Sequence, residues 1–185
     1  AVIFRILKMY PPAEDSELMA EFLPRVIRKE HPQSFLDMGC GSGIQSATAL
    51  KAGIKKENIL AVDIDEEALQ ETEKLEVKTR KSDLFQNIKG KFDLIAFNPP
   101  YLPEDKHEKG KDTTGGKEGW ETIERFLHQS KSHLTEEGKI LLLFSSLTNK
   151  EKVEALIQEN GFSFRMLAVQ QQFMEDLYLV ILERY

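Results

Sequence analysis

Short apolar runs alternate with amphipathic stretches along most of this 185-residue chain. Runs of four to eight mostly apolar residues predict buried strands, whereas apolar residues three or four positions apart predict helices with one buried face. Strands are expected at residues 34–38, 58–63, 75–79, 92–97, 139–145, 162–169 and 177–183, and helices at 44–50, 66–75, 118–134 and 150–160. This order predicts an α/β fold, a doubly wound and mostly parallel seven-stranded sheet with an antiparallel C-terminal hairpin.

One further helix is expected before the first strand. Asp15 or Ser16 can cap it, and apolar residues at helical spacing follow. Pro24 lies inside that spacing, so we expect the helix to kink or split there. No internal repeat and no linker rich in Pro, Gly or Ser divides the sequence. We therefore expect one domain over residues 1–185, with residues 1–30 forming an N-terminal extension packed on it.

The most informative strand is Phe92–Phe97, which is almost continuously apolar and stops at Asn98-Pro99-Pro100-Tyr101. A proline has no amide to donate to a sheet, and Pro99 favours an extended conformation at Asn98. The sequence thus holds a polar amide stiffly at the carboxyl end of a buried strand, beside an aromatic ring. Open α/β sheets bind their ligands at such strand ends.

A second polar turn follows the first strand. Residues 39–43 read Gly-Cys-Gly-Ser-Gly, and a helix is expected from Ile44 onward. Glycines let the backbone approach a ligand closely, and the first turn of a helix offers free amides. The spacing departs from the G-x-G-x-x-G of dinucleotide sites, and the lysine of a P-loop is missing. The turn therefore indicates a ligand other than a nucleotide diphosphate.

Three carboxylates accompany this turn, namely Asp37 before it, Asp63 at the end of the second strand and Asp83 after the third. An acid at the end of the second strand is placed to accept hydrogen bonds from ribose hydroxyls. Three acids suit a cationic nucleoside better than a phosphorylated one. S-adenosylmethionine, with its sulfonium, ammonium and adenosine, meets that description. Asp83 follows Asp63 by only 20 residues, which predicts a short helix or a short strand between them.

The composition of the chain limits the cellular compartments and the classes of partner that we expect for it. The net charge is −6, which disfavours binding to a nucleic-acid backbone. A single cysteine, Cys40, excludes an internal disulfide, and the four histidines show no ligand spacing, so no metal site is predicted. No apolar run approaches the roughly 20 residues that cross a bilayer. We expect a cytoplasmic protein without a signal peptide or membrane span.

Taken together, Asp37-Met-Gly-Cys-Gly-Ser-Gly43, Asp63, Asp83 and Asn98-Pro-Pro-Tyr101 resemble the class I S-adenosylmethionine-dependent methyltransferases that alkylate planar amino groups. The sequence is most similar to the HemK family of release-factor glutamine methyltransferases, in its short archaeal and eukaryotic branch. Pro-Ala-Glu-Asp-Ser at residues 12–16 and Gly-Gly-Lys-Glu-Gly at 115–119 indicate that branch. So does the expected lack of a separate N-terminal helical domain.

The resemblance implies a role for each motif residue. Ser16 and the glycine turn would surround the methionine part of the cofactor, Asp63 would hold the ribose, and the turn at Asp83 would meet the adenine. Asn98 and the Pro99 carbonyl would bind the substrate –NH2 group, and Tyr101 would pack over it. The implied cofactor residues are Ser16, Asp37, Gly39, Cys40, Gly41, Gly43, Asp63, Ile64, Asp83, Leu84 and Asn98, and the implied catalytic residues are Asn98, Pro99, Pro100 and Tyr101.

The resemblance leaves the substrate open. The leading interpretation is methyl transfer to a glutamine side-chain amide of a protein, a translation release factor. The alternative is a nucleic-acid amino-methyltransferase acting on adenine N6 or guanine N2, because Asn-Pro-Pro-Tyr serves both chemistries. A third class is a non-catalytic cofactor-binding subunit. The resembling branch also implies a small zinc-binding activator subunit, for which the third strand, at the open sheet edge, is the expected contact. Residues 103–117, glycine-rich and charged, are expected to form a mobile lid.

Overall fold

The fold is given by a computed structural model that describes residues 13–100 and 119–185. Within these ranges seven strands form one sheet in the order β3-β2-β1-β4-β5-β7-β6. β1 to β5 run parallel to one another, and β7 pairs antiparallel with both β5 and β6. The predicted doubly wound sheet with a C-terminal hairpin is confirmed. The strands are β1 (Phe35–Met38), β2 (Ile59–Asp63), β3 (Lys78–Lys81), β4 (Phe92–Phe97), β5 (Leu134–Ser145), β6 (Phe162–Gln171) and β7 (Asp176–Arg184).

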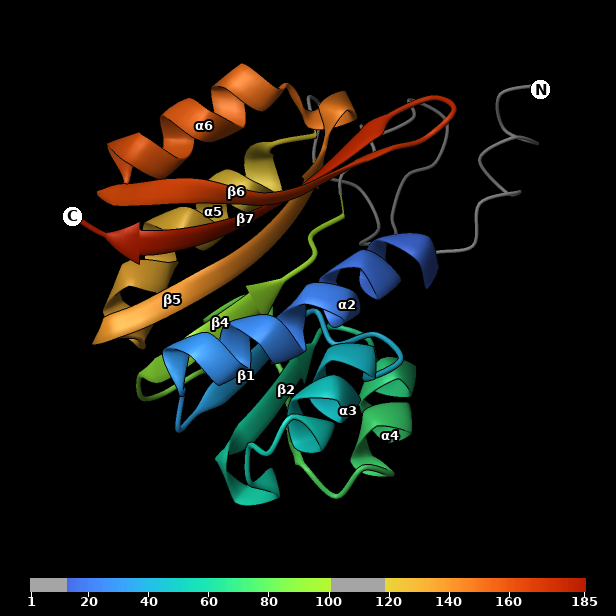
Figure 1. The fold of residues 1–185 in the computed structure, drawn as a ribbon. Helices are drawn as coiled ribbons and strands as arrows, with labels where there is room; N and C mark the ends of the chain where they lie inside the picture. Colours follow the sequence, from blue (N-terminus) through green and yellow to red (C-terminus); the bar gives the residue numbers. More distant parts are fainter. Residues whose placement is uncertain (1–12, 101–118) are drawn as a thin grey trace.

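Helices cover both faces of the sheet (Figure 1). One face carries α2 (Ala13–Glu30), α3 (Ile44–Lys51) and α4 (Glu66–Glu73), and the other carries α5 (Glu121–Ser130) and α6 (Lys150–Glu159). Successive side chains of a strand point to opposite faces, so a strand covered on both sides needs apolar residues at nearly every position. β1 is buried at all its positions and β4 at all but one, which explains their apolar runs.

The strand order reverses at β1, because the chain first builds outward through β2 and β3 and then returns to add β4 on the other side. Ligands of open α/β sheets bind at the carboxyl ends of the strands at such a reversal. The glycine turn at residues 39–43 directly follows β1, Asp63 closes β2, and Asn98 directly follows β4. The fold therefore brings the sequence-predicted site residues to one edge of the sheet.

The N-terminal helix differs from the prediction at two points. α2 begins at Ala13, so Asp15 and Ser16 lie within its first turn and neither is its N-cap. The helix also runs through Pro24 without splitting. A proline inside a helix costs about 3 kcal/mol. Here Leu23 and Ile27 on either side of it are 0% and 6% exposed, and their burial against the sheet offsets that cost.

The predicted helix at residues 118–134 is shorter in the structure. α5 ends at Ser130, a 3₁₀ turn spans Lys131–His133, and Leu134 is already the first residue of β5. Gly138 lies inside β5 rather than before it. A Cβ at Gly138 would lie 2.7 Å from Leu134 Cγ and 2.9 Å from the Phe92 carbonyl oxygen, and the β4–β5 register shifts at Phe92. Only glycine fits this irregularity, which the sequence pattern did not reveal.

The short spacing between Asp63 and Asp83 has the predicted effect. α4 has eight residues and β3 has four, starting at Lys78 rather than at residue 75. β3 is an edge strand, as expected. Side chains cap two of the helices, because Asp65 accepts from the Glu67 amide at the start of α4, and Asn149 accepts from the Lys152 amide at the start of α6.

Two further predictions depend on which residues the structure describes. The lid expected at residues 103–117 lies outside the described residues. Among the helices of residues 13–100 and 119–185, none is long and apolar enough to cross a membrane.

Candidate active site

The glycine turn after β1 is fastened to the end of β2. The amides of Gly39 and Cys40 donate to the Val62 carbonyl at 2.8 and 2.9 Å. All three glycines of the turn have positive φ, a conformation that glycine adopts without a steric penalty. At Gly43 a side chain is excluded as well, because a Cβ would lie 2.9 Å from Oγ1 of Thr72 on α4. The turn therefore depends on its glycines for its path around the strand end.

Asp63 holds the same turn through its side chain. Its Oδ2 accepts from the Gly41 amide at 2.9 Å, and its Oδ1 accepts from the Asp65 amide at 3.0 Å. Each carboxylate oxygen can accept a second hydrogen bond. Asp63 can thus fix the glycine turn and still accept hydrogen bonds from the hydroxyls of a ligand.

Asp37 is a buried carboxylate at the pocket side of β1, with 2% of its surface exposed. The amide and the hydroxyl of Ser46 both donate to its Oδ2, at 3.0 and 2.7 Å. Burial raises the pKa of Asp37 to about 6; the two Ser46 hydrogen bonds oppose this shift, and the charge of Asp63 adds to it. An acid so buried is stabilised in its ionised form by a cation placed next to it.

Cys40 has no chemical role at this turn. Burial raises the pKa of its thiol to about 12, and Thr72 Oγ1 lies 3.4 Å from its sulfur. The thiol is therefore neutral at physiological pH and a poor nucleophile. We therefore interpret Cys40 as a small residue of the turn rather than as a nucleophile.

A pocket of about 370 Å³ lies between the glycine turn, the start of α2 and the end of β4. Two side-chain oxygens at this pocket, Asn98 Oδ1 and Gln45 Oε1, are buried and accept no hydrogen bond from the described part of the chain. The amide nitrogen of Gln45 donates to the Ser16 carbonyl at 2.8 Å, which joins α3 to α2 across the pocket wall. A buried acceptor without a donor costs about 1–3 kcal/mol. Both oxygens are thus suited to donors that arrive with a ligand.

The turn after β3 carries the other predicted cofactor residues. Leu84 has a positive φ of 49°, an unfavourable conformation for leucine, and the Ser82 hydroxyl donates to its carbonyl at 2.8 Å. Ser82 also accepts from the Asn87 amide at 2.9 Å. Strained turns of this kind are concentrated at ligand sites. Asp83 in this turn forms an ion pair with Arg125 of α5 at 2.6 Å.

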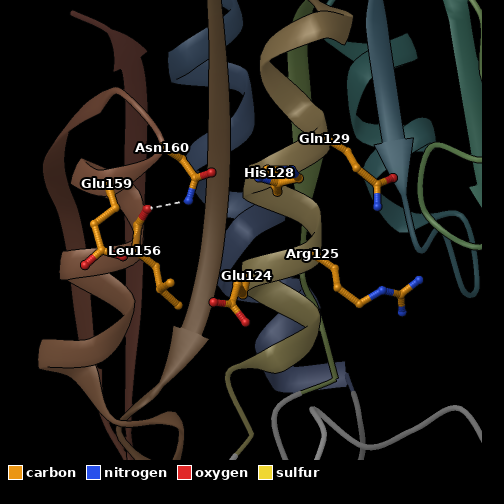
Figure 2. A pocket seen from close by; sticks show the side chains of 7 residues that line it. All are labelled: Glu124, Arg125, His128, Gln129, Leu156, Glu159 and Asn160. Atoms are coloured by element: carbon orange, nitrogen blue, oxygen red, sulfur yellow. Dashed lines mark hydrogen bonds between the residues drawn. The ribbon is translucent and has the colours of Figure 1, made fainter.

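A second depression, of about 420 Å³, lies between α5 and α6 (Figure 2). Figure 2 shows Glu124 and His128 of α5 and Glu159 of α6 along it, and Asn160 donating to the Leu156 carbonyl at 2.8 Å. Its lining comes from α5, α6 and the residue after α6, and it includes neither Asn98 nor Gln45, the two residues with a buried oxygen that accepts no described hydrogen bond. Because it lacks such acceptors for a ligand, we place the active site at the strand ends.

The structure brings together six of the predicted site residues in the lining of that pocket, namely Ser16, Asp37, Gly39, Cys40, Gly41 and Asn98. Gly43, Asp63, Ile64, Asp83, Leu84, Pro99 and Pro100 lie at the adjoining strand ends but outside the lining, and Tyr101 lies outside the described residues. Met38 and Ser42, which belong to the predicted loop from Asp37 to Gly43, also line the pocket, whereas the sequence prediction missed Met19, Ile44, Gln45 and Ala96 in the lining, as well as Arg125. Of these, Gln45 could have been found from its place in the first turn after the glycine loop.

The donor set fits a cationic nucleoside. One buried carboxylate and two buried unpartnered oxygens line the pocket, while lysine and arginine are absent from its described lining. Such a site favours an ammonium or a sulfonium and disfavours a phosphate. With Asp63 at the end of β2 for a ribose, the residues present fit S-adenosylmethionine.

Comparison with known proteins agrees with this geometry. Residues 14–174 match the family model described as "Methyltransferase small domain". A relative from Methanocaldococcus jannaschii, provisionally named a protein N5-glutamine methyltransferase, is 35% identical over 94% of this chain and 90% of its own length. The release factor glutamine methyltransferase of Aquifex aeolicus is 30% identical over 76% of this chain, and the match spans 56% of that enzyme.

Among solved structures, the chain is similar to one in the E. cuniculi Mtq2–Trm112 complex responsible for methylation of the eRF1 translation termination factor. The TM-score is 0.74 at 24% identity, over 95% of this chain and 98% of the other. This similarity supports the fold, and the sequence relatives extend it to the family. The chain belongs to the methyltransferase small domain family, and within it to the HemK-like S-adenosylmethionine-dependent methyltransferases.

Proposed function

We propose that this enzyme methylates the side-chain amide of a glutamine in a protein, and that this protein is a translation release factor. The observation that carries the proposal is Asn98 Oδ1, a buried acceptor at the pocket and at the end of β4 that receives no hydrogen bond from residues 13–100 and 119–185. A substrate –NH2 group supplies the donor that this oxygen lacks. The names of the archaeal and bacterial relatives support glutamine as the source of that group.

The chain's own residues have a defined task in this reaction. S-adenosylmethionine, when bound, supplies a methyl group activated by its sulfonium. The glutamine nitrogen is a weak nucleophile, because its lone pair is delocalised into the amide carbonyl. Asn98 Oδ1 and the carbonyl of Pro99 accept its two N–H groups, which orients the nitrogen and stabilises the positive charge that develops on it. No side chain has to form a covalent bond.

Methyl transfer from labelled S-adenosylmethionine tests the proposal. Purified unmethylated release factor, release factor with its target glutamine changed to alanine, and duplex DNA or transfer RNA are offered in parallel. We expect label only in the unchanged release factor. Label in a nucleic acid instead would support the adenine N6 or guanine N2 alternative and refute the proposal.

Cofactor affinity should depend on pH through Asp37. Its pKa of about 6 in the free protein means that the carboxyl is increasingly protonated below pH 6. A cationic cofactor favours the ionised form, so binding below pH 6 releases a proton, and affinity should fall up to about tenfold per pH unit as the pH drops further. Calorimetry between pH 5 and 7 in buffers of different ionisation enthalpy measures both effects.

Asp37→Asn provides the control for this prediction, because it keeps an acceptor for Ser46 but cannot ionise. Its affinity should be weaker at pH 7 and nearly independent of pH over the same range. The free wild-type protein should also lose about 2 kcal/mol of stability relative to this variant between pH 4 and pH 6. The folded state binds the Asp37 proton more tightly than the unfolded chain, so stability falls as the pH rises through this window. A wild-type pH profile that Asp37→Asn reproduces would exclude Asp37 as its source.

We also propose that a small zinc-binding activator subunit adds to the free edge of β3. The strand order supports this edge, and the related complex of Mtq2 with Trm112 supports a partner of this kind. Charged side chains on β3 and just before it would oppose pairing with another strand. Two of them are engaged within the chain, because Lys81 pairs with Glu66 at 3.2 Å and Glu76, which precedes the strand, pairs with Lys56 at 2.8 Å. The backbone edge of β3 can therefore accept a strand from a partner.

Co-expression with the matching zinc protein should yield a complex that elutes as one species. Hydrogen exchange should then show slower exchange of the β3 amides at residues 78–81. β6, at the opposite edge of the sheet, serves as the internal control and should be unchanged. Independent elution of the two chains, with full activity of the methyltransferase alone, is the result that contradicts this proposal.

A further inference from the structure

Most of the exposed large apolar side chains gather at one end of the molecule. In the described part of the chain five such residues are exposed, namely Leu147, Val169, Phe173, Met174 and Tyr185. The first four lie at the turn between β6 and β7 or beside it, and we call them the tip patch. Phe173 is 81% exposed and Met174 57%. Single exposed apolar residues are ordinary, but a cluster of them at a chain turn marks a contact surface.

The tip patch has a fixed position relative to the sheet. The amide of Asp176 donates to Ser146 Oγ at 3.0 Å, and the hydroxyl of Ser145 donates to the Glu175 carboxylate. These contacts hold the turn over the carboxyl end of β5. Figure 1 shows the β6–β7 turn projecting beyond that strand end, at the end of the molecule where α2 begins.

The same turn lies towards the end of the sheet that holds the active-site pocket. The carboxyl of Glu175 is half-buried, and it interacts electrostatically with Asp15 near the start of α2. The next residue, Ser16, lines the pocket together with Asn98. The tip patch and the pocket therefore both lie at the carboxyl end of the sheet, on the side where α2 begins.

We propose that the tip patch docks the polypeptide substrate, by holding an apolar segment next to the glutamine that enters the pocket. This inference rests on the proposed function and adds the surface that recognises the protein around its target side chain. Glu175 and Asp176 follow Phe173 and Met174 directly in the turn, and these acids disfavour a nucleic-acid backbone or an anionic membrane as the occupant of the patch.

The size of the tip patch also fits a transient substrate. The tip patch presents four large exposed apolar side chains. A few apolar anchors at the centre of a contact suffice for weak, reversible binding. An enzyme must release its methylated product, so such binding suits a substrate surface better than a dimer interface.

The double variant Phe173→Ser/Met174→Ser tests the docking role, with Tyr185→Ser as the matched control. Tyr185 is 80% exposed, and it lies at the other end of the same hairpin, where its amide reaches the Gly161 carbonyl. Unmethylated release factor is varied at saturating S-adenosylmethionine, with the activator subunit present in every reaction. We expect the double variant to raise KM for the protein at least tenfold, with kcat and cofactor affinity within twofold of wild type. Tyr185→Ser should behave as wild type.

Each other outcome overturns the inference in a recognisable way. An unchanged KM in the double variant, or an equal rise in Tyr185→Ser, shows that the tip patch does not dock the substrate although the enzyme methylates it. A wild-type chain that elutes as a dimer, converted to a monomer by the double variant without a change in KM, assigns the patch to a second copy. A wild-type enzyme that ignores release factor and methylates nucleic acid refutes the proposed function itself, and the docking role with it.

Discussion

Asn98→Ala should fold, bind S-adenosylmethionine with unchanged affinity and lose at least about a hundredfold in kcat. The loss has the size expected when one positioned acceptor is removed from a site that stabilises developing charge. Stability should not fall, because Asn98 Oδ1 is buried and accepts no hydrogen bond from any residue that the structure describes. Removing an unsatisfied acceptor relieves a desolvation cost, which offsets the packing lost with the side chain. Single-turnover kinetics, calorimetry and thermal unfolding measure the three quantities.

Asn160→Ala is the matched control for this prediction. Asn160 lies in the depression between α5 and α6, and its amide donates to the Leu156 carbonyl at the end of α6. Its loss should lower stability by about 1 kcal/mol and leave turnover unchanged. The two asparagines should thus show opposite patterns. If Asn98→Ala loses cofactor affinity in step with turnover, Asn98 belongs to the cofactor pocket rather than to the substrate site.

The fold could be predicted from the sequence wherever burial alone determines the structure. β1 and β4 are covered on both faces, and this burial requires the apolar runs from which the two strands were predicted. The errors occur where local signals compete with packing. Pro24 predicted a kink or a split in α2, and the split does not occur, because the buried residues on both sides of it keep the helix continuous. Leu134 matched the helical spacing of α5, although a 3₁₀ turn places it in β5.

Site residues that belong to one contiguous motif could be predicted, whereas those that depend on tertiary contacts could not. The glycine turn and Asn98 follow directly from the ends of two buried strands. Nothing in the sequence indicates that Arg125 reaches Asp83, which lies 42 residues before it. The tip patch depends likewise on the hairpin register and on the hydrogen bond from Asp176 to Ser146. Such pairings arise only when the sheet is assembled.

The Asp83–Arg125 ion pair affects how well Asp83 can serve as the predicted contact for the adenine of the cofactor. Both side chains are almost half exposed, at 44% and 49%, so the pair contributes little to stability. It does keep the Asp83 carboxylate on the α5 side of the turn after β3. The backbone of this turn, with the strained Leu84 held by Ser82, is better fixed than the Asp83 side chain. Asp83 is therefore a weaker anchor for a cofactor than Asp63.

Asp63→Ala should reduce the affinity for S-adenosylmethionine by more than any other change to the cofactor residues. Charge-assisted hydrogen bonds to ribose hydroxyls account for about 2–3 kcal/mol, which is roughly a 30- to 150-fold rise in Kd. The structure adds a second reason, because the same carboxylate holds the Gly41 amide at 2.9 Å. Without it the glycine turn keeps its two backbone hydrogen bonds to the Val62 carbonyl but loses the third bond, at Gly41, so this part of the turn has to be ordered again on binding.

Asp65→Ala separates this effect from a general loss of charge or of helix stability. Asp65 lies two residues further along, is exposed and caps α4 by accepting from the Glu67 amide at 3.0 Å. Its removal should cost about 1 kcal/mol of stability, as for other helix caps, and leave the Kd unchanged. Asp63→Asn, which keeps one acceptor oxygen, should fall between wild type and Asp63→Ala. Calorimetry that finds wild-type affinity in Asp63→Ala, or equal losses in Asp63→Ala and Asp65→Ala, would remove Asp63 from the cofactor site.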